Sequence, residues 1–268
     1  MANNRNLILI ALAILLLVGG VFAYTTLREP EAASTPIEAI PLATSAPQAS
    51  PTTAATEAPT AASIATQAAP TVAATPVNTV APTSSAATGS EPILAQIIPE
   101  ESEVRFIIDE VLNNNPKTVV GTTNQVAGEL SVDPSNPSAS QVGVIQVNAR
   151  TLATDNDFRN RAIKNRILMT DQYEFISFKP TQLTGLPNSV TMGQSYTFQM
   201  AGELTIRDTT KPVTFEVTVT PESNERLKGT AKTSIAYADF GLTIPQVQQV
   251  ASVAENVRLE IDFVAVPK

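Results

Sequence analysis

The sequence contains no cysteine, no histidine and no tryptophan among its 268 residues. Without cysteine and histidine there is no disulfide, no thiolate nucleophile, no imidazole base and no metal site built from those ligands. Aromatic residues make up only 5% of the chain, which disfavours a carbohydrate-stacking platform. The formal net charge is −8, and an acidic chain repels the phosphate backbone of nucleic acids. These absences remove most hydrolase, redox and nucleic-acid-binding mechanisms.

An unbroken apolar run lies close to the amino terminus. Leu7–Val18 holds no polar residue, Arg5 precedes it, and no acid occurs before Glu29. With the apolar residues that follow, the run reaches the roughly 17–25 residues that cross a bilayer. We therefore expect residues 1–27 to be a signal anchor, a single transmembrane helix in the cell membrane, with the rest of the chain extracytoplasmic. The alternative is a signal peptide cleaved near residues 21–23, which would leave the protein secreted or periplasmic.

Residues 28–92 have a different composition, dominated by Ala, Thr, Pro and Ser. Such a segment buries too little apolar surface to offset its conformational entropy, and its prolines favour extended backbone. We expect a disordered linker that separates the anchor from a folded domain. Its Ser, Thr and Pro content is also typical of O-glycosylated stalks.

Residues 93–268 show the alternation of apolar and polar residues that is typical of β-strands. In Ser195–Thr220 the apolar residues share one parity on each side of a break at Arg207–Thr210, which predicts a hairpin with one apolar face. The pattern predicts an all-β fold, an eight-stranded antiparallel barrel with short helical insertions at residues 155–168 and 245–253. A barrel of this size is either filled by side chains or holds one small ligand. The expected strands are Glu103–Leu112, Val119–Val132, Gln141–Arg150, Glu174–Leu183, Ser195–Ile206, Lys211–Thr220, Arg226–Ala236 and Val257–Val266.

Three stretches of this domain resemble one family. They are GELTIRDTTKPVTFEV, TSIAYADFGLTIP with the final strand NVRLEIDFVA, and TLATDNDFRNRAIKNRIL followed by EFISF. On these stretches the chain is similar to the YceI-like family over essentially all of residues 93–268. The resemblance implies a lipocalin-like barrel, with helices near its mouth, that binds a polyisoprenoid lipid or a quinone tail.

The sequence departs from the family's pattern where a headgroup would be held. Family members commonly carry Arg-Asp-x-His in the helical segment. Here Arg159 matches the arginine, but Asn160 stands for the acid and Ala162 for the histidine. Tyr237 replaces the basic residue that is usual before the Asp-Phe-Gly triplet. A headgroup contact that depends on that histidine is therefore absent.

Two groups of residues are candidates for ligand binding. Apolar strand residues would contact a lipid tail, but the same alternation is equally typical of a filled core. These residues are Phe106, Phe198, Met200, Phe215, Val217 and Phe263. Four cations of the helical stretch would pair with a pyrophosphate headgroup or with anionic membrane lipids, or else form a solvated helix face. These cations are Arg159, Arg161, Lys164 and Arg166.

No catalytic residue, metal site or cofactor is predicted. Two carboxylate pairs, Asp109 with Glu110 and Asp155 with Asp157, have the residue type for glycosidic chemistry but no supporting motif. Asp155 and Asp157 are better placed to cap a helix. The leading hypothesis is a non-enzymatic, membrane-tethered protein that binds an isoprenoid lipid or quinone outside the cytoplasm. The alternatives are a surface-displayed structural or adhesion module with a filled barrel, and an exported hydrolase.

Overall fold

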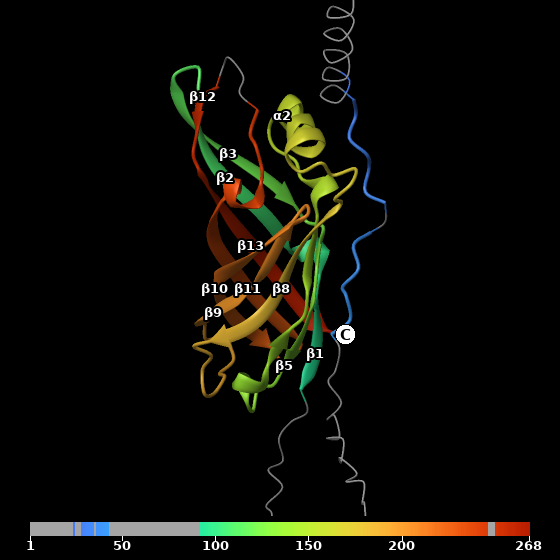
Figure 1. Cartoon of the computed structure of the whole chain (residues 1–268). Coiled ribbons are helices and arrows are strands. Elements are labelled where there is room, and N and C mark those ends of the chain that lie inside the picture. The colour runs from blue at the N-terminus through green and yellow to red at the C-terminus, as the bar shows by residue number, and fades with distance from the viewer. Residues whose placement is uncertain (1–23, 25–27, 35, 43–91, 246–249) are drawn as a thin grey trace, which may run out of the picture. The chain divides into compact units, whose positions relative to one another are not determined.

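The computed structural model describes residue 24 and residues 28–34, 36–42, 92–245 and 250–268. The chain forms two units, residues 1–43 with 89–268 and residues 44–88, and every described residue belongs to the first. Thirteen strands of the described part form one antiparallel sheet (Figure 1). The strands are β1 (Ile93–Ile97), β2 (Glu103–Leu112), β3 (Asn115–Thr123), β4 (Val126–Ala127), β5 (Glu129–Val132), β6 (Gln141–Val142), β7 (Ile145–Asn148), β8 (Phe175–Thr184), β9 (Tyr196–Ile206), β10 (Thr209–Ser223), β11 (Arg226–Ala236), β12 (Val250–Val253) and β13 (Asn256–Pro267). The helical elements are η1 (Pro99–Glu101), η2 (Pro137–Ala139), η3 (Ala149–Thr151), α2 (Asp157–Ala162), the π-helix η4 (Ile163–Ile167) and η5 (Tyr237–Phe240).

The sheet curls until its two ends meet. Its order is β4-β7-β8-β9-β10-β11-β13-β1-β5-β6, while β2 pairs with β13, β3 and β12. β4 and β5 lie near opposite ends of this order, yet Gly128 alone separates them in the chain. The all-β, antiparallel fold expected from the alternation is therefore confirmed, and we call this layer the curled sheet.

The expected number of eight strands is wrong, since the described residues form thirteen. The expected strand Val119–Val132 is divided among β3, β4 and β5, and Gln141–Arg150 among β6, β7 and η3. These segments change partner as they bend: β4 pairs with β7, whereas β5 pairs with β1 and β6. Alternation reports which face a residue occupies but not which strand lies beside it, so it missed these breaks.

The expected hairpin is formed by β9 and β10. Their pairing runs from Ile206 opposite Thr209 to Tyr196 opposite Val219. Arg207 and Asp208 connect the strands, and Arg207 has a φ of 59°, the left-handed conformation that tight hairpin turns require. The apolar parity of both strands is buried, as predicted.

Two phenylalanine rings occupy the space beside glycines on a neighbouring strand. Phe106 pairs with Gly121, and Phe263 pairs with Gly229. A Cβ atom on Gly121 would lie 2.1 Å from Phe106 Cε1, and one on Gly229 would lie 2.4 Å from Phe263 Cζ. These glycines therefore set the positions of both rings on the inner face of the curled sheet.

The helical insertion expected at residues 155–168 is confirmed as α2 followed by η4. Its cap differs from the expected one, because Asn156 accepts a hydrogen bond from the backbone N–H of Arg159 at 2.9 Å. Asp155 instead pairs with Arg159 and Lys117, and the hydrogen bond from Lys117 lowers the pKa of this carboxyl. Asp157 lies in the first turn, where a carboxylate complements the helix dipole.

The prediction of a second helix at residues 245–253 is wrong for residues 250–253, the described carboxyl-terminal part of that range. Residues 250–253 form β12, in which Val250 lies opposite Leu112 and Val253 opposite Glu110 of β2. β-Branched valines favour a strand when a free sheet edge is available for pairing.

Most of the expected anchor and linker lies outside the described residues. Of residues 1–27 the structure describes only residue 24, and of residues 28–92 it describes 28–34, 36–42 and 92. In the described part of the chain, no helix has the length and apolar character needed to cross a membrane.

The first part of the expected linker contacts the folded domain. We call residues 28–34 and 36–42 the strap; it is the blue segment in Figure 1. Ser34 donates two hydrogen bonds to the carboxylate of Glu174, at 2.9 Å from its N–H and 2.7 Å from its hydroxyl. Ile37 is only 8% exposed, and the N–H of Leu42 donates to Glu129 at 2.7 Å. The strap is therefore attached along the curled sheet, although its composition predicted a free spacer.

Candidate functional site

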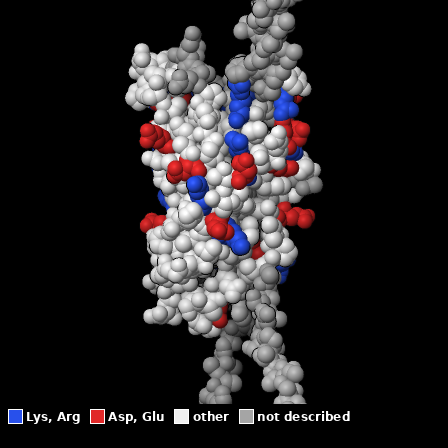
Figure 2. Space-filling model, in the orientation of Figure 1, with Lys and Arg blue, Asp and Glu red and all other residues white. Residues whose placement is uncertain are grey.

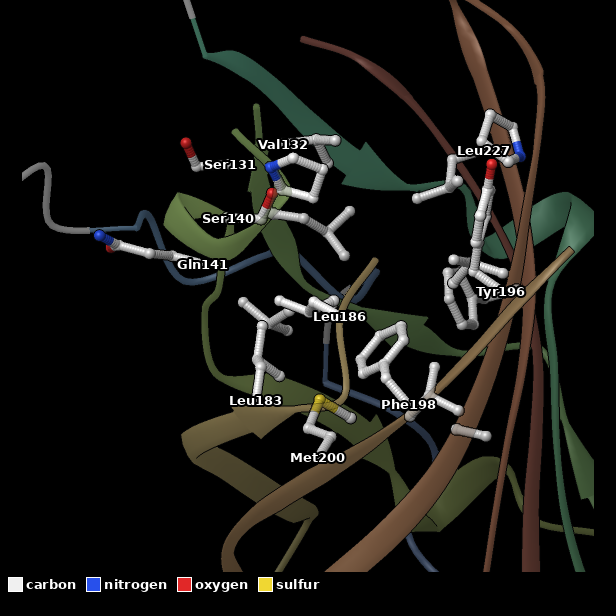
Figure 3. A pocket seen from close by; sticks show the side chains of 18 of the residues that line it. Ser131, Val132, Ser140, Gln141, Leu183, Leu186, Tyr196, Phe198, Met200 and Leu227 are labelled. Atoms are coloured by element: carbon white, nitrogen blue, oxygen red, sulfur yellow. The ribbon is translucent and has the colours of Figure 1, made fainter. Parts of the chain in front are cut away.

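The inner face of the curled sheet encloses an apolar cavity near the turn between β10 and β11. This cavity, cavity 1, has a volume of about 110 Å³. Leu183, Leu186, Phe198 and Met200 point into it (Figure 3). Its lining is almost entirely hydrocarbon, so a ligand would find very few hydrogen-bonding groups there.

A second apolar cavity lies at the α2 end of the curled sheet. This cavity, cavity 2, has a volume of about 220 Å³. Ile163 and Ile167 of the helical segment cover it, and Ile176 and Leu204 line it from β8 and β9. The helical insertion therefore closes the interior of the sheet with its apolar side.

Two isoleucines separate the cavities. Ile145 of β7 and Ile261 of β13 are both buried, and each lines both cavities. Close by, the rings of Phe178 and Phe215 pack edge to face with their centroids 4.8 Å apart. The interior is thus divided into two chambers by side chains and not by backbone.

An ion pair lies at cavity 2. Arg159 Nη2 is 2.9 Å from Glu110 Oε1, and Arg159 Nη1 is 2.6 Å from Asp155 Oδ1. The side chain of Glu110 is only 8% exposed and that of Arg159 is 19% exposed. Removing Arg159 would leave the largely buried carboxylate of Glu110 without its partner, which is costly. The charge at this cavity is therefore already balanced within the protein.

The other three cations of the helical stretch do not line either cavity. The guanidinium of Arg161 lies 5.8 Å from the ring centroid of Phe158, which is 71% exposed. Lys164 and Arg166 are half-buried on η4, and burial lowers the pKa of Lys164. The four expected headgroup residues thus divide between cavity 2 and the outer surface of the helical end.

A family model, described as the YceI-like domain, matches residues 96–265. The chain belongs to the YceI-like family. The chain is 25% identical over 184 residues to a UPF0312 protein of Pseudomonas fluorescens, and the match covers 66% of this chain and 89% of that protein. It is 27% identical over 132 residues to a UPF0312 protein of Vibrio cholerae, and this match covers 47% of this chain and 66% of that protein.

Two solved structures share the fold of the YceI-like domain. One is BcnA of Burkholderia cenocepacia, with a TM-score of 0.51, 15% identity, and coverage of 63% of this chain and 98% of that chain. The other is a polyisoprenoid binding domain from Saccharophagus degradans implicated in plant cell wall breakdown. It has a TM-score of 0.53, 11% identity, and coverage of 66% of this chain and 99% of that chain. At these identities the similarity establishes the fold alone.

All six apolar residues singled out in the sequence face the interior of the YceI-like domain. Phe198, Met200, Val217 and Phe263 line cavity 1, whereas Phe106 and Phe215 line cavity 2. The alternation therefore predicted their face correctly. It did not predict that they serve two separate chambers.

Sequence reasoning missed other lining residues for identifiable reasons. Ile261 shares the parity of Phe263 and could have been included. Leu183 has the opposite parity to Phe178, and only a bulge between Pro180 and Gln182 brings both to the inner face. Leu186 and Val190 lie in the β8–β9 loop, where no periodic signal exists.

The carboxylates considered for catalysis are engaged elsewhere in the YceI-like domain. Glu110 pairs with Arg159 at cavity 2, while its neighbour Asp109 is exposed and accepts a hydrogen bond from Thr118 at 2.6 Å. The two face opposite sides of the sheet and do not flank a common space. Within the described ranges, no group of three or more acidic residues is arranged to hold a metal ion.

Proposed function

We propose that this YceI-like protein binds the tail of an isoprenoid lipid or quinone in its two apolar cavities, outside the cytoplasm and without altering it chemically. The proposal includes tethering to the cell membrane by the amino-terminal apolar run. The observation that supports binding best is a pair of cavities inside the curled sheet whose lining is almost entirely hydrocarbon. The polyisoprenoid binding domain of similar fold lends further support.

The cavities match short isoprenoid segments in size. An engineered apolar cavity of about 150 Å³ binds benzene, so the 220 Å³ of cavity 2 corresponds to roughly nine carbons, or about two isoprene units. Burying nine such carbons contributes roughly 7 kcal/mol before the loss of ligand motion is subtracted. The 110 Å³ of cavity 1, on the other side of Ile145 and Ile261, corresponds to about one isoprene unit.

The ion pair at cavity 2 favours an uncharged headgroup. Because Arg159 already contacts Glu110 and Asp155, a phosphate would have to displace a carboxylate to bind it. A quinone or a free prenol needs no such exchange. We therefore place quinones and prenols ahead of phosphorylated lipids as ligands.

Extraction of the purified protein tests this function. The full chain is purified in a detergent free of isoprenoids, extracted with organic solvent and analysed by mass spectrometry. We expect an isoprenoid or quinone in up to equimolar amount, and much less from an identically prepared chain in which Val217→Trp fills cavity 1 and Leu204→Trp fills cavity 2. Equal traces from both chains would show that the interior holds no lipid, and the filled structural module would then be the better hypothesis.

A further inference from the structure

The strap has a fixed direction on the domain. At its start, Arg28 pairs with Asp171, and its carbonyl accepts a hydrogen bond from Asn165 Nδ2 at 2.9 Å. At its end, the N–H of Leu42 donates to Glu129 of β5. Asn165 belongs to η4, so the strap begins beside the helical end and runs away from it (Figure 1).

Contacts in the middle of the strap hold it in this direction. Glu31 Oε2 lies 2.9 Å from Arg150 Nη2, and the carbonyl of Ala32 accepts a hydrogen bond from Arg150 Nη1 at 3.1 Å. Ser34 bonds twice to Glu174, and Ile37 is buried. These groups include an apolar anchor and charge-assisted hydrogen bonds, so the strap has more than one type of attachment.

Tyr24, the described residue that precedes the strap, is close to the helical end. The N–H of Arg28 donates to the carbonyl of Tyr24 at 3.0 Å, and Tyr24 is the last residue of the apolar stretch that includes Leu7–Val18. Four residues of chain span at most about 14 Å. Any membrane that holds the run thus lies within a short distance of Arg28.

The surface at this end has the composition of a membrane-facing surface. Residues 157–167 carry one carboxylate and four cations, in a chain whose net charge is −8. Of these cations, Arg159 is already paired with Glu110 and Asp155, and the contact would use Arg161 and Lys164. Phe158 and Tyr24 are both largely exposed, and Arg161 lies over the Phe158 ring. In Figure 2, Lys and Arg side chains lie at the end where Figure 1 shows α2 and along the middle of this face, with Asp and Glu side chains among them, and the opposite end shows few charges. Exposed aromatic residues beside cations are typical of segments that lie on anionic bilayers.

We infer that the helical end, formed by α2 and η4, rests on the anionic surface of the bilayer and that the strap holds it there. Cavity 2 then lies on the membrane side of the domain, behind Ile163 and Ile167, so a lipid tail that enters past these two side chains does not cross water. This inference rests on the proposed tethering. It adds to that proposal a defined orientation, a defined contact surface and a partner, which is an anionic lipid surface.

Site-directed labels test the orientation, since the chain has no native cysteine. A fluorophore is attached to Asp157→Cys on α2 or, as the matched control, to Glu225→Cys in the β10–β11 turn, in the full chain. Each protein is reconstituted into vesicles of phosphatidylglycerol and phosphatidylcholine in equal parts. We expect the label at 157 to be shielded from a water-soluble quencher and reached by a lipid-borne one, and the label at 225 to show the reverse.

Variants then separate the contributions of strap and charge. Ile37→Asp should release the strap and remove the shielding at 157, whereas Ala33→Asp, which adds the same charge at an exposed strap position, should keep it. Replacing Arg161 and Lys164 with glutamine should weaken the contact roughly 25-fold, at about fivefold for each cation near the surface. Cooperative melting of each variant shows that the fold is kept.

The outcomes distinguish the orientation on the membrane from the tethering on which it depends. If the chain floats with the vesicles but the two labels are equally quenched, or if Ile37→Asp leaves the shielding unchanged, the orientation is refuted and the tethering stands. If the chain does not float with vesicles at all, both the orientation and the tethering are refuted. Lipid binding in the cavities is judged separately, by the extraction.

Discussion

The partition between the cavities offers a direct test of how the interior is used. Ile261 is 9% exposed and lines both cavities, so Ile261→Ala removes three carbons from the wall that divides them. In the lipid-free protein this substitution should lower the free energy of unfolding by about 2–5 kcal/mol, because neighbouring side chains only partly fill the space that the isoleucine leaves. For a domain of this size each kcal/mol lowers Tm by about 2–4 °C, so a fall of roughly 4–20 °C is expected.

The same substitution should change the preferred length of the ligand. If the joined cavities admit one more isoprene unit, its five carbons contribute about 4 kcal/mol before ordering costs, or up to roughly a thousandfold in affinity. The assay is competition between a fluorescent isoprenoid and prenols of increasing length. Wild-type affinity should rise with chain length and then level off, and Ile261→Ala should level off at least one unit later.

Ile235→Ala is the matched control for this experiment. Ile235 of β11 is 8% exposed and, of the two cavities, lines only cavity 2. Its truncation to alanine should therefore lower the free energy of unfolding about as much as Ile261→Ala does, without joining the two cavities. An identical length limit in the wild type and Ile261→Ala would refute the partition. An equal shift in Ile235→Ala would show that added volume anywhere, and not the joining of the chambers, sets the preferred length.

Three further predictions concern cavity 1, the ion pair and a buried carboxylate. Val217→Trp should lower the amount of lipid recovered in extraction assays by the share that cavity 1 holds, with little change in Tm, whereas a close-packed interior would instead lose about 1–3 kcal/mol on denaturant unfolding. Arg159→Gln should lower the free energy of unfolding by roughly 1–3 kcal/mol, because Glu110 loses its partner. The double variant with Glu110→Gln should recover most of this loss, and an equal Tm for the single and double variants would refute the coupling. Glu129 accepts a hydrogen bond from Lys268 Nζ at 2.6 Å, which lowers its pKa below the ordinary 4.5. A carboxyl whose pKa is lower in the folded state stabilises the fold at pH values above its ordinary pKa, and this stabilisation is lost as the pH falls through its folded-state pKa. The Tm of the wild type should therefore fall more steeply below about pH 4.5 than the Tm of Glu129→Gln. Parallel Tm profiles would show that this contact does not contribute.

The sequence predicted the long strands because each buries one face. β2 and β11 coincide with the expected ranges, and β9 differs by a single residue, since alternation runs through most of each strand. β12 was missed because its four residues are too few for a period to show. The strap was missed because its attachment depends on a single buried residue, Ile37, and on hydrogen bonds to distant residues, which leave no local pattern.

The site was predictable in part for similar reasons. The face that carries Phe198 and Met200 followed from parity, but the division of the interior depends on where Ile145 and Ile261 meet across the sheet. The cations of the helical stretch looked like one cluster in the sequence. A helix distributes neighbours around its axis, so Arg159 turns to cavity 2 while Arg161 packs beside Phe158 on the outer surface.

The strap and β1 also depend on the same strand. Leu42 is bonded to Glu129 of β5, and β1 pairs with β5 as well, with Gln96 opposite Glu129. A substitution that displaces β5 would therefore disturb the attachment of the strap and the pairing of β1 together, although these two segments are far apart in the sequence.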